Sequence, residues 1–143
     1  MKKILFLSMI ISLIIVSCTQ QEVKSPIEGA WKLVYAQWDP NGGNFPTTIT
    51  GSDIKIWAKD YFASVGQLKF DTIMSDAYVG GTYTLEGNKY TETVMYHANK
   101  EYLGNEVKLL LEIQNDTLIQ RYPADDNWNL QEGYATEKYV RMK

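Results

Sequence analysis

The sequence of 143 residues contains very little cysteine and histidine, with Cys18 and His97 as the single example of each. One cysteine cannot form a disulfide within the chain, and thiolate metal sites need more than one. A histidine with no second histidine or cysteine to join it is a poor metal ligand, so we expect no metal and no cofactor. The fold must therefore be held by core burial alone, which is feasible for a domain of about 120 residues.

Basic residues are also in the minority. The chain has 14 lysines and arginines against 17 aspartates and glutamates, a formal net charge of −3. An acidic chain is a poor partner for nucleic acid. No glycine-rich phosphate loop joins a strand to a helix, and no segment repeats apolar residues with the helical period. The sequence thus argues against nucleotide binding and against a long helix.

The N-terminus is compositionally separate from the rest. Lys2 and Lys3 precede an apolar run at residues 4–16 that contains no acidic residue. The run is shorter than the roughly 20 residues that span a bilayer, and it fits a secretory signal. The following residues, Ile15-Val16-Ser17-Cys18, resemble a bacterial lipobox, in which the cysteine is lipidated and becomes the new first residue.

This resemblance implies a signal peptide at residues 1–17 and a lipidated Cys18 with a polar tether to residue 26. The domain would then occupy residues 27–143, anchored by lipid to a membrane of the cell envelope and facing the periplasm or the surface. The alternative is an ordinary signal peptide with a cysteine near its cleavage site by chance.

The segment at residues 80–97 predicts a β-hairpin. Two runs with alternating apolar and polar residues flank Gly87-Asn88, a pair that tolerates the positive φ of a tight turn. Alternation places one set of side chains on the apolar face of the second strand: Tyr90, Glu92, Val94 and Tyr96. His97 is expected on the opposite face, exposed or at a rim.

Other short strands follow the same rhythm. They are predicted at residues 27–38, 54–59, 61–66, 67–71, 106–114, 117–122 and 133–142. Loops are predicted at residues 39–53, 99–105 and 123–131, with a loop or single helical turn at residues 71–78. Roughly eight antiparallel strands in one small domain predict an all-β barrel or sandwich.

The chain also resembles a known family. Its first strand contains Gly29-Ala30-Trp31, similar to the Gly-x-Trp start of the lipocalins, and the whole resembles the bacterial lipocalin-like domains of small lipoproteins. The other matching pieces are residues 54–57, 62–63, 81–83, 90–92, 96–97, 116–118 and 137–141. The resemblance implies an eight-stranded calycin-type barrel, with Trp31 packed against Arg141 in a structural contact. It also implies binding of a small, partly hydrophobic molecule.

Glu92 is the most unusual residue on the predicted interior face. A buried carboxylate without a partner would cost several kcal/mol, so it needs a cation, a hydrogen-bond donor or a ligand. The candidate partners are Arg121, Lys55 or a tyrosine hydroxyl. A role in contacting ligand is the second possibility, and an outward, solvated side chain is the third.

Three classes of function remain open. The preferred one is a small-molecule-binding protein whose ligand-contacting residues are Trp57, Phe62, Tyr83, Tyr90, Glu92, Tyr96 and Arg121. For Trp57 and Phe62, a place in the core is the favoured alternative. The second class is a protein–protein interaction module with a filled barrel and an exposed patch of Trp38, Phe45 and Trp128. The third is an enzyme with Glu92 as general acid or base, although no second catalytic group is evident.

Overall fold

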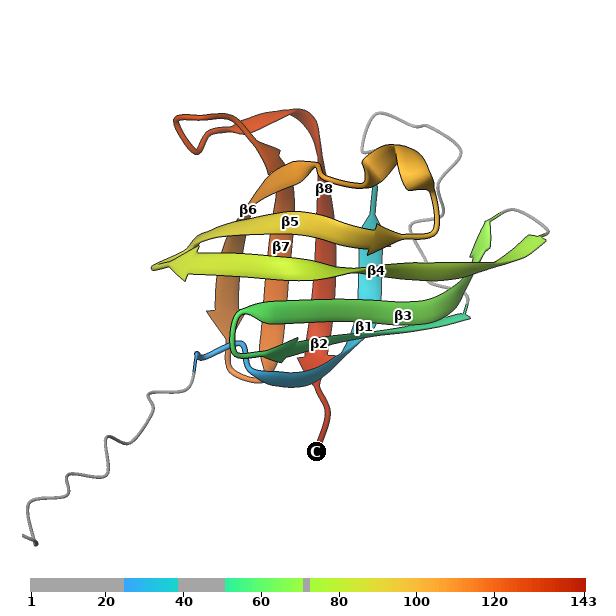
Figure 1. Cartoon of the computed structure of the whole chain (residues 1–143). Helices are drawn as coiled ribbons and strands as arrows, with labels where there is room; N and C mark the ends of the chain where they lie inside the picture. The colour runs from blue at the N-terminus through green and yellow to red at the C-terminus, as the bar shows by residue number, and fades with distance from the viewer. Residues whose placement is uncertain (1–24, 39–50, 71–72) are drawn as a thin grey trace, which may run out of the picture.

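Eight strands form a closed antiparallel barrel in the computed structural model, which describes residues 25–38, 51–70 and 73–143. Each strand pairs with its neighbours in sequence, and the last strand returns to pair with the first (Figure 1). The elements are β1 (Gly29–Gln37), β2 (Gly51–Ala58), β3 (Tyr61–Phe70), β4 (Ile73–Glu86), β5 (Lys89–His97), a 3-10 helix η1 (Lys100–Tyr102), β6 (Glu106–Gln114), β7 (Thr117–Ala124) and β8 (Leu130–Arg141). In this described part of the chain, no helix has the length and hydrophobicity needed to cross a membrane. The predicted eight-stranded barrel is confirmed.

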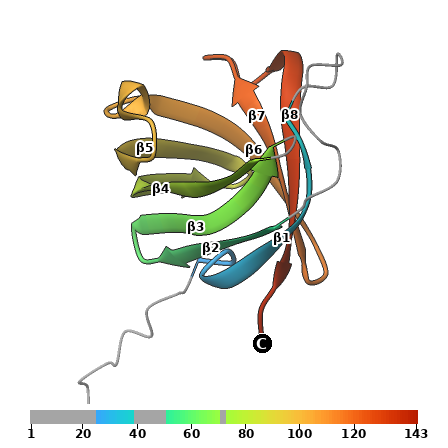
Figure 2. The same ribbon diagram turned by 90° about the vertical axis from the view of Figure 1, so that its right-hand side faces the viewer.

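The two ends of the barrel differ in their connections. One end, here called the hairpin end, carries the two-residue turns of β2–β3, β4–β5 and β6–β7 (Figure 1). Each turn begins with a residue at positive φ: Lys59 at 53°, Gly87 at 63° and Asn115 at 55°. The other end, here called the loop end, carries η1 and the longer connections, and Figure 2 shows both ends from the side. The tight turns of the hairpin end leave little room for an opening there.

The predicted hairpin is confirmed, since β4 and β5 pair around Gly87-Asn88. The loop or helical turn predicted at residues 71–78 is wrong, because Ile73 to Tyr78 form the first part of β4 and pair with β3. The neighbouring strand supplies a full set of backbone partners, which outweighs the low strand propensity of Asp76. Cys18, Phe45 and most of the predicted loop at residues 39–53 lie outside the described residues.

A β-bulge changes the phase of β5 near its end. Gly80 pairs with Tyr96 and Gly81 with Val94, so Met95 is an extra residue without a partner in β4. A one-residue shift exchanges the two faces of a strand. Glu92 and Val94 therefore point into the barrel, whereas Tyr96 is 65% exposed on the outer wall. The prediction that Tyr96 faces inward is wrong for this reason.

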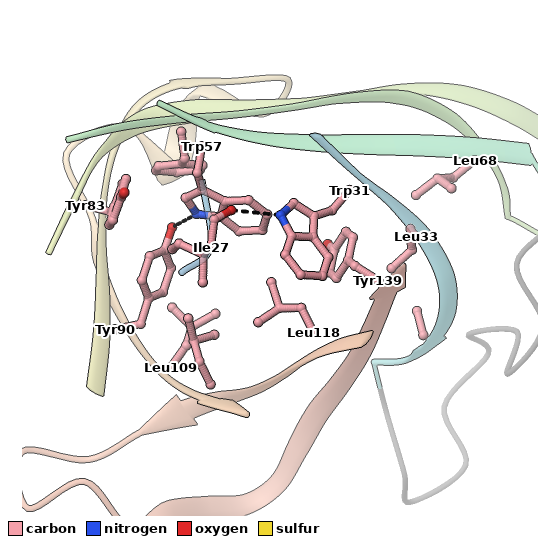
Figure 3. Packing of buried hydrophobic residues seen from close by; sticks show 13 residues of the cluster. Ile27, Trp31, Leu33, Trp57, Leu68, Tyr83, Tyr90, Leu109, Leu118 and Tyr139 are labelled. Carbon is pink, nitrogen blue, oxygen red and sulfur yellow. Dashed lines mark hydrogen bonds between the residues drawn. The ribbon is translucent and has the colours of Figure 1, made fainter. Parts of the chain in front are cut away.

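Large aromatic side chains fill the half of the barrel nearest the hairpin end. Trp31, Trp57 and Tyr90 are at most 1% exposed. The indole nitrogen of Trp57 donates a hydrogen bond of 2.7 Å to the hydroxyl of Tyr90, and its ring meets those of Tyr90 and Tyr139 edge-on (Figure 3). This half of the barrel is a packed core.

The segment before β1 closes the hairpin end. Ile27 is fully buried, and its carbonyl oxygen accepts a hydrogen bond of 2.8 Å from the Trp31 indole (Figure 3). The guanidinium of Arg141 donates to the carbonyl oxygens of Pro26 and Glu28 and lies 4.1 Å from the centre of the Trp31 ring. This is the contact that the lipocalin resemblance implies, and a cation over an indole contributes about 0.5–2 kcal/mol.

Candidate functional site

A cavity of about 260 Å³ lies in the half of the barrel nearest the loop end. All eight strands contribute side chains to its wall, together with Trp38 after β1 and Tyr102 on η1. The apolar wall comprises Leu33, Leu68, Val79, Val94, Val107 and Leu109, and the aromatic wall Trp38, Tyr102, Tyr122 and Tyr139. The polar wall comprises Asp53, Lys55, Ser64, Glu92, His97, Gln120 and Glu137. An apolar cavity with a few converging polar groups is the usual form of a small-molecule site.

A buried salt bridge separates the cavity from the aromatic core. The ammonium of Lys55 on β2 lies 2.5 Å from a carboxylate oxygen of Glu92 on β5, across the barrel. The same ammonium is 3.3 Å from the amide oxygen of Gln120. It also lies over the rings of Trp57 and Phe62, at 5.2 and 5.1 Å from their centres. Of the three partners expected for Glu92, the structure supplies Lys55 and the Tyr90 hydroxyl, whereas Arg121 pairs with Glu112 instead.

Glu137 accepts hydrogen bonds from four neutral groups. Its Oε1 atom accepts from the Trp38 indole at 2.7 Å and the Tyr122 hydroxyl at 2.8 Å. Its Oε2 atom accepts from the Gln120 amide at 3.1 Å and the Tyr139 hydroxyl at 2.7 Å. Four donors fill the acceptor positions of an ionised carboxylate, whereas a protonated carboxyl would present a donor of its own.

The two tyrosines of this arrangement remain donors. Burial, followed by the neighbouring Glu137 carboxylate, holds the pKa of both the Tyr122 and Tyr139 hydroxyls well above the ordinary value. A phenol that stays protonated can stabilise an adjacent carboxylate at any physiological pH. The negative charge on Glu137 is thus spread over neutral dipoles.

Asp53 is less well supplied with donors. It is 5% exposed and accepts a hydrogen bond of 2.5 Å from the Ser64 hydroxyl on its Oδ1 atom. Burial raises the pKa of the Asp53 carboxyl; the Ser64 hydrogen bond lowers it, and the nearby charge of Glu137 raises it further. The cavity therefore contains a carboxyl group whose ionised form is poorly stabilised by the protein itself.

The residues predicted to contact ligand divide into three groups. Trp57, Phe62, Tyr83 and Tyr90 lie in the packed core on the hairpin side of the salt bridge. Glu92 lines the cavity. Tyr96 and Arg121 lie on the outer wall, where the Arg121 guanidinium is 3.1 Å from Glu112 and far from pairing with Glu92.

Arg121 faces outward because β7 alternates in the opposite phase from the one that the prediction assumed. Leu118 and Gln120 are fully buried, so Arg121 belongs to the other face of the strand. The expectation that Arg121 orients a ligand inside the barrel is wrong.

Tyr96 contributes to a groove on the outer wall instead. Around Gly80, where there is no side chain, lie the exposed side chains of Tyr61, Val65, Tyr78 and Met95 together with Tyr96. His97, at the end of the same strand, turns toward the cavity and packs its ring against Tyr102 on η1 at 4.6 Å. The bulge in β5 thus reverses the faces of the strand expected for these two side chains, while His97 lies at the end of β5, in keeping with the rim position expected for it.

Two of the aromatic residues expected to form one exposed patch, Trp38 and Trp128, are separated. Trp38 lines the cavity and donates to Glu137. Trp128, in the turn between β7 and β8, lies beside the ammonium groups of Lys89 and Lys108 at 5.5 and 5.8 Å. Trp38 and Trp128 therefore do not share a surface with each other.

Several polar residues of the cavity were not singled out from the sequence. Gln120 lies between Leu118 and Tyr122 on its face of β7, and Glu137 lies between Ala135 and Tyr139 on its face of β8. Asp53 shares its face of β2 with Lys55 and Trp57. The same alternation that drew attention to Glu92 would have placed these side chains inside the barrel. Which of them meet across the barrel depends on the register of distant strands.

Comparisons with known proteins leave the family open. No family model matches the chain, and no curated protein is similar enough to be matched. Among solved structures, one match is described as the REP1-NXSQ fatty acid transporter, with 11% identity over 81% of this chain and 96% of that chain and a TM-score of 0.40. A TM-score below 0.5 is too low to support an inference about ligand or family.

Proposed function

We propose that this chain is a lipid-anchored, extracytoplasmic protein that binds a small amphipathic molecule inside a lipocalin-like barrel. The observation that carries the proposal is the cavity of about 260 Å³ between the Lys55–Glu92 salt bridge and the loop end. Apolar side chains such as Leu68 and Val94 would bury the hydrocarbon part of the ligand. The polar wall would orient its polar part.

The division of the barrel into two halves supports binding over a purely structural role. A filled scaffold needs no hollow, and the aromatic core nearest the hairpin end already supplies the packing. Polar and charged side chains in the other half have no need to be buried for stability, because buried ion pairs are weak contributors to it. Their presence around a cavity is typical of a ligand site.

A pair of matched variants tests the proposal. Val94 is 4% exposed and lines the cavity, whereas Val34 is 48% exposed on the outer face of β1. Val94→Phe should fill part of the cavity, and Val34→Phe adds the same atoms to the outer wall. Native mass spectrometry of the full chain purified from its own host should find a co-purifying molecule with the wild type and Val34→Phe but not with Val94→Phe.

Retained binding in Val94→Phe would remove the support for the proposal. A molecule that remains bound in Val94→Phe, at wild-type occupancy and with an unchanged unfolding temperature, would have to bind somewhere other than this cavity. Titration of the same three proteins with a neutral hydrophobic fluorophore gives an independent reading, since it does not depend on a ligand surviving purification.

A further inference from the structure

Negatively charged side chains outnumber lysine and arginine around the cavity. Asp53, Glu92 and Glu137 all line it, and each is at most 9% exposed. Lys55 is the one lysine or arginine among the described lining residues. The charges of the site are therefore unbalanced toward the negative side.

Lys55 is already committed to partners within the protein. Its ammonium donates to Glu92 at 2.5 Å and to Gln120 at 3.3 Å, and aromatic rings of the core lie beside it. An incoming carboxylate would have to compete with Glu92 for this ammonium while lying close to two further carboxyl groups. Like charges brought together in a site of low dielectric repel strongly. A ligand with an anionic head is thus poorly matched to the cavity.

The two remaining carboxyl groups, Glu137 and Asp53, differ in whether they have a vacant hydrogen-bond acceptor for a cation. Glu137 has its acceptor positions filled by four neutral donors, so it supplies charge but no vacant acceptor. Asp53 accepts one hydrogen bond, from Ser64 to Oδ1, and no described residue donates to its other oxygen. Asp53 therefore combines a buried position, a place on the cavity wall and a free acceptor.

We propose that the cavity selects amphipathic molecules with an ammonium head, which donates an N–H to Asp53 beside the charge of Glu137 while its chain packs on Leu68 and Val94. This proposal narrows the class of ligand and rests on the proposed function. An organic cation is favoured over a metal ion, since no group of three or more His, Cys, Asp or Glu side chains within the described ranges is placed to hold one. Charge-assisted hydrogen bonds are about twice as strong as neutral ones, which gives the site a means of discrimination.

Three probes with the same chain and different heads test the selectivity: decylammonium, decanol and decanoate. Each is titrated by calorimetry into the full chain, below the concentration at which it forms micelles. Decylammonium should bind about tenfold more tightly than decanol, since a charge-assisted hydrogen bond replaces a neutral one. Decanoate should bind most weakly of the three.

Two carboxylate variants locate the effect. Asp53→Asn should reduce the affinity for decylammonium by about tenfold and change that for decanol by less than about twofold. Glu112→Gln, on the outer wall, removes a carboxylate of similar charge without touching the cavity and should leave all three affinities unchanged. Val94→Phe should weaken the binding of all three probes.

The outcomes separate this inference from the proposed function. Equal or tighter binding of decanol or decanoate, or an unchanged affinity of Asp53→Asn for decylammonium, overturns the preference for a cation while binding in the cavity stands. If Val94→Phe leaves every affinity at the wild-type value, or if no probe binds the wild type, the proposed function itself fails and the inference fails with it.

Discussion

Lys55 and Glu92 form the boundary between the packed and hollow halves of the barrel. Each is less than 10% exposed, and each is the main charged partner of the other. Removing one member of such a pair leaves a charge that the interior cannot solvate, whereas replacing both by apolar groups is often neutral. The pair therefore specifies where the two halves meet more than it stabilises the fold.

Lys55→Met should destabilise the protein by about 3–5 kcal/mol, because it leaves the Glu92 carboxylate buried without a cation. Adding Glu92→Leu should recover most of that loss. The surface pair Lys108–Asp126, with the aspartate 97% exposed, is the control, and Lys108→Met should cost less than about 1 kcal/mol. Urea unfolding of the four proteins measures all three values. If Lys55→Met were as stable as the wild type, Glu92 would have to have another charged partner.

The raised pKa of Asp53 makes the free energy of unfolding depend on pH, and the direction of the pKa shift fixes the sign of that dependence. The folded protein favours the protonated carboxyl because burial opposes its ionisation. Folding is therefore assisted by this group below the ordinary aspartate pKa of about 3.9, and the assistance is lost as the pH rises through the higher pKa of the folded state.

Asp53→Asn removes this titration and can still accept the Ser64 hydrogen bond. The free energy of unfolding of the wild type, minus that of Asp53→Asn, should fall as the pH is raised from about 3 to 7. Urea unfolding across that range measures the difference. A difference that rises with pH would mean that the folded protein stabilises the ionised carboxylate.

Among the elements, the β4–β5 pair decides which side chains reach the cavity. Its turn at Gly87-Asn88 and the inward positions of Tyr90, Glu92 and Val94 could be predicted from local alternation and turn chemistry. The bulge opposite Gly80 and Gly81 could not be predicted, because nothing in the sequence of β5 itself indicates that Met95 is an extra residue. Every side chain beyond the bulge was consequently assigned to the wrong face.

Similar limits apply to the polar wall of the cavity. Alternation places Asp53, Lys55 and Trp57 on one face of β2, and Glu137 with Tyr139 on one face of β8. The contact of Lys55 with Glu92 joins β2 to β5, which are not adjacent strands. Such contacts depend on the stagger of the closed sheet, which no single segment of sequence contains.

Gly81 should be essential to the bulge. A methyl group added there would overlap the carbonyl oxygen of Thr93 on β5, and backbone cannot move aside as a flexible side chain would. Gly81→Ala should therefore destabilise the barrel by about 2 kcal/mol or more. Gly87→Asn is the control, because nothing lies within 4 Å of a β-carbon at Gly87 and asparagine tolerates its φ of 63°. Thermal unfolding of both variants measures the difference. Equal stability of Gly81→Ala and Gly87→Asn would contradict the assigned register of β4 and β5.

At the scale of the whole molecule, a barrel closed at one end and hollow at the other fits a protein held by its N-terminus near a membrane. The described chain begins at Ser25, at the hairpin end, and the cavity lies toward the opposite, loop end of the barrel. In this arrangement a lipid anchor at Cys18 would leave the loop end free to meet a ligand.

The anchor itself is open to a direct test. Cys18→Ala should move the protein from the membrane fraction to the soluble fraction of its host and abolish incorporation of labelled palmitate, because the cysteine is the proposed acceptor of the lipid. Ser17→Ala, which keeps a small residue before the cysteine, should remain in the membrane fraction. Fractionation that is identical for Cys18→Ala and the wild type would refute lipid anchoring at this position.

The most direct test of the central claim is a crystal structure of the protein with decylammonium. We expect the nitrogen to lie about 3 Å from the free carboxylate oxygen of Asp53 and the chain to lie along Leu68 and Val94. Decylammonium found in the outer groove beside Tyr61 and Tyr96, with the cavity unchanged, would contradict the claim that the hollow half of the barrel is the binding site.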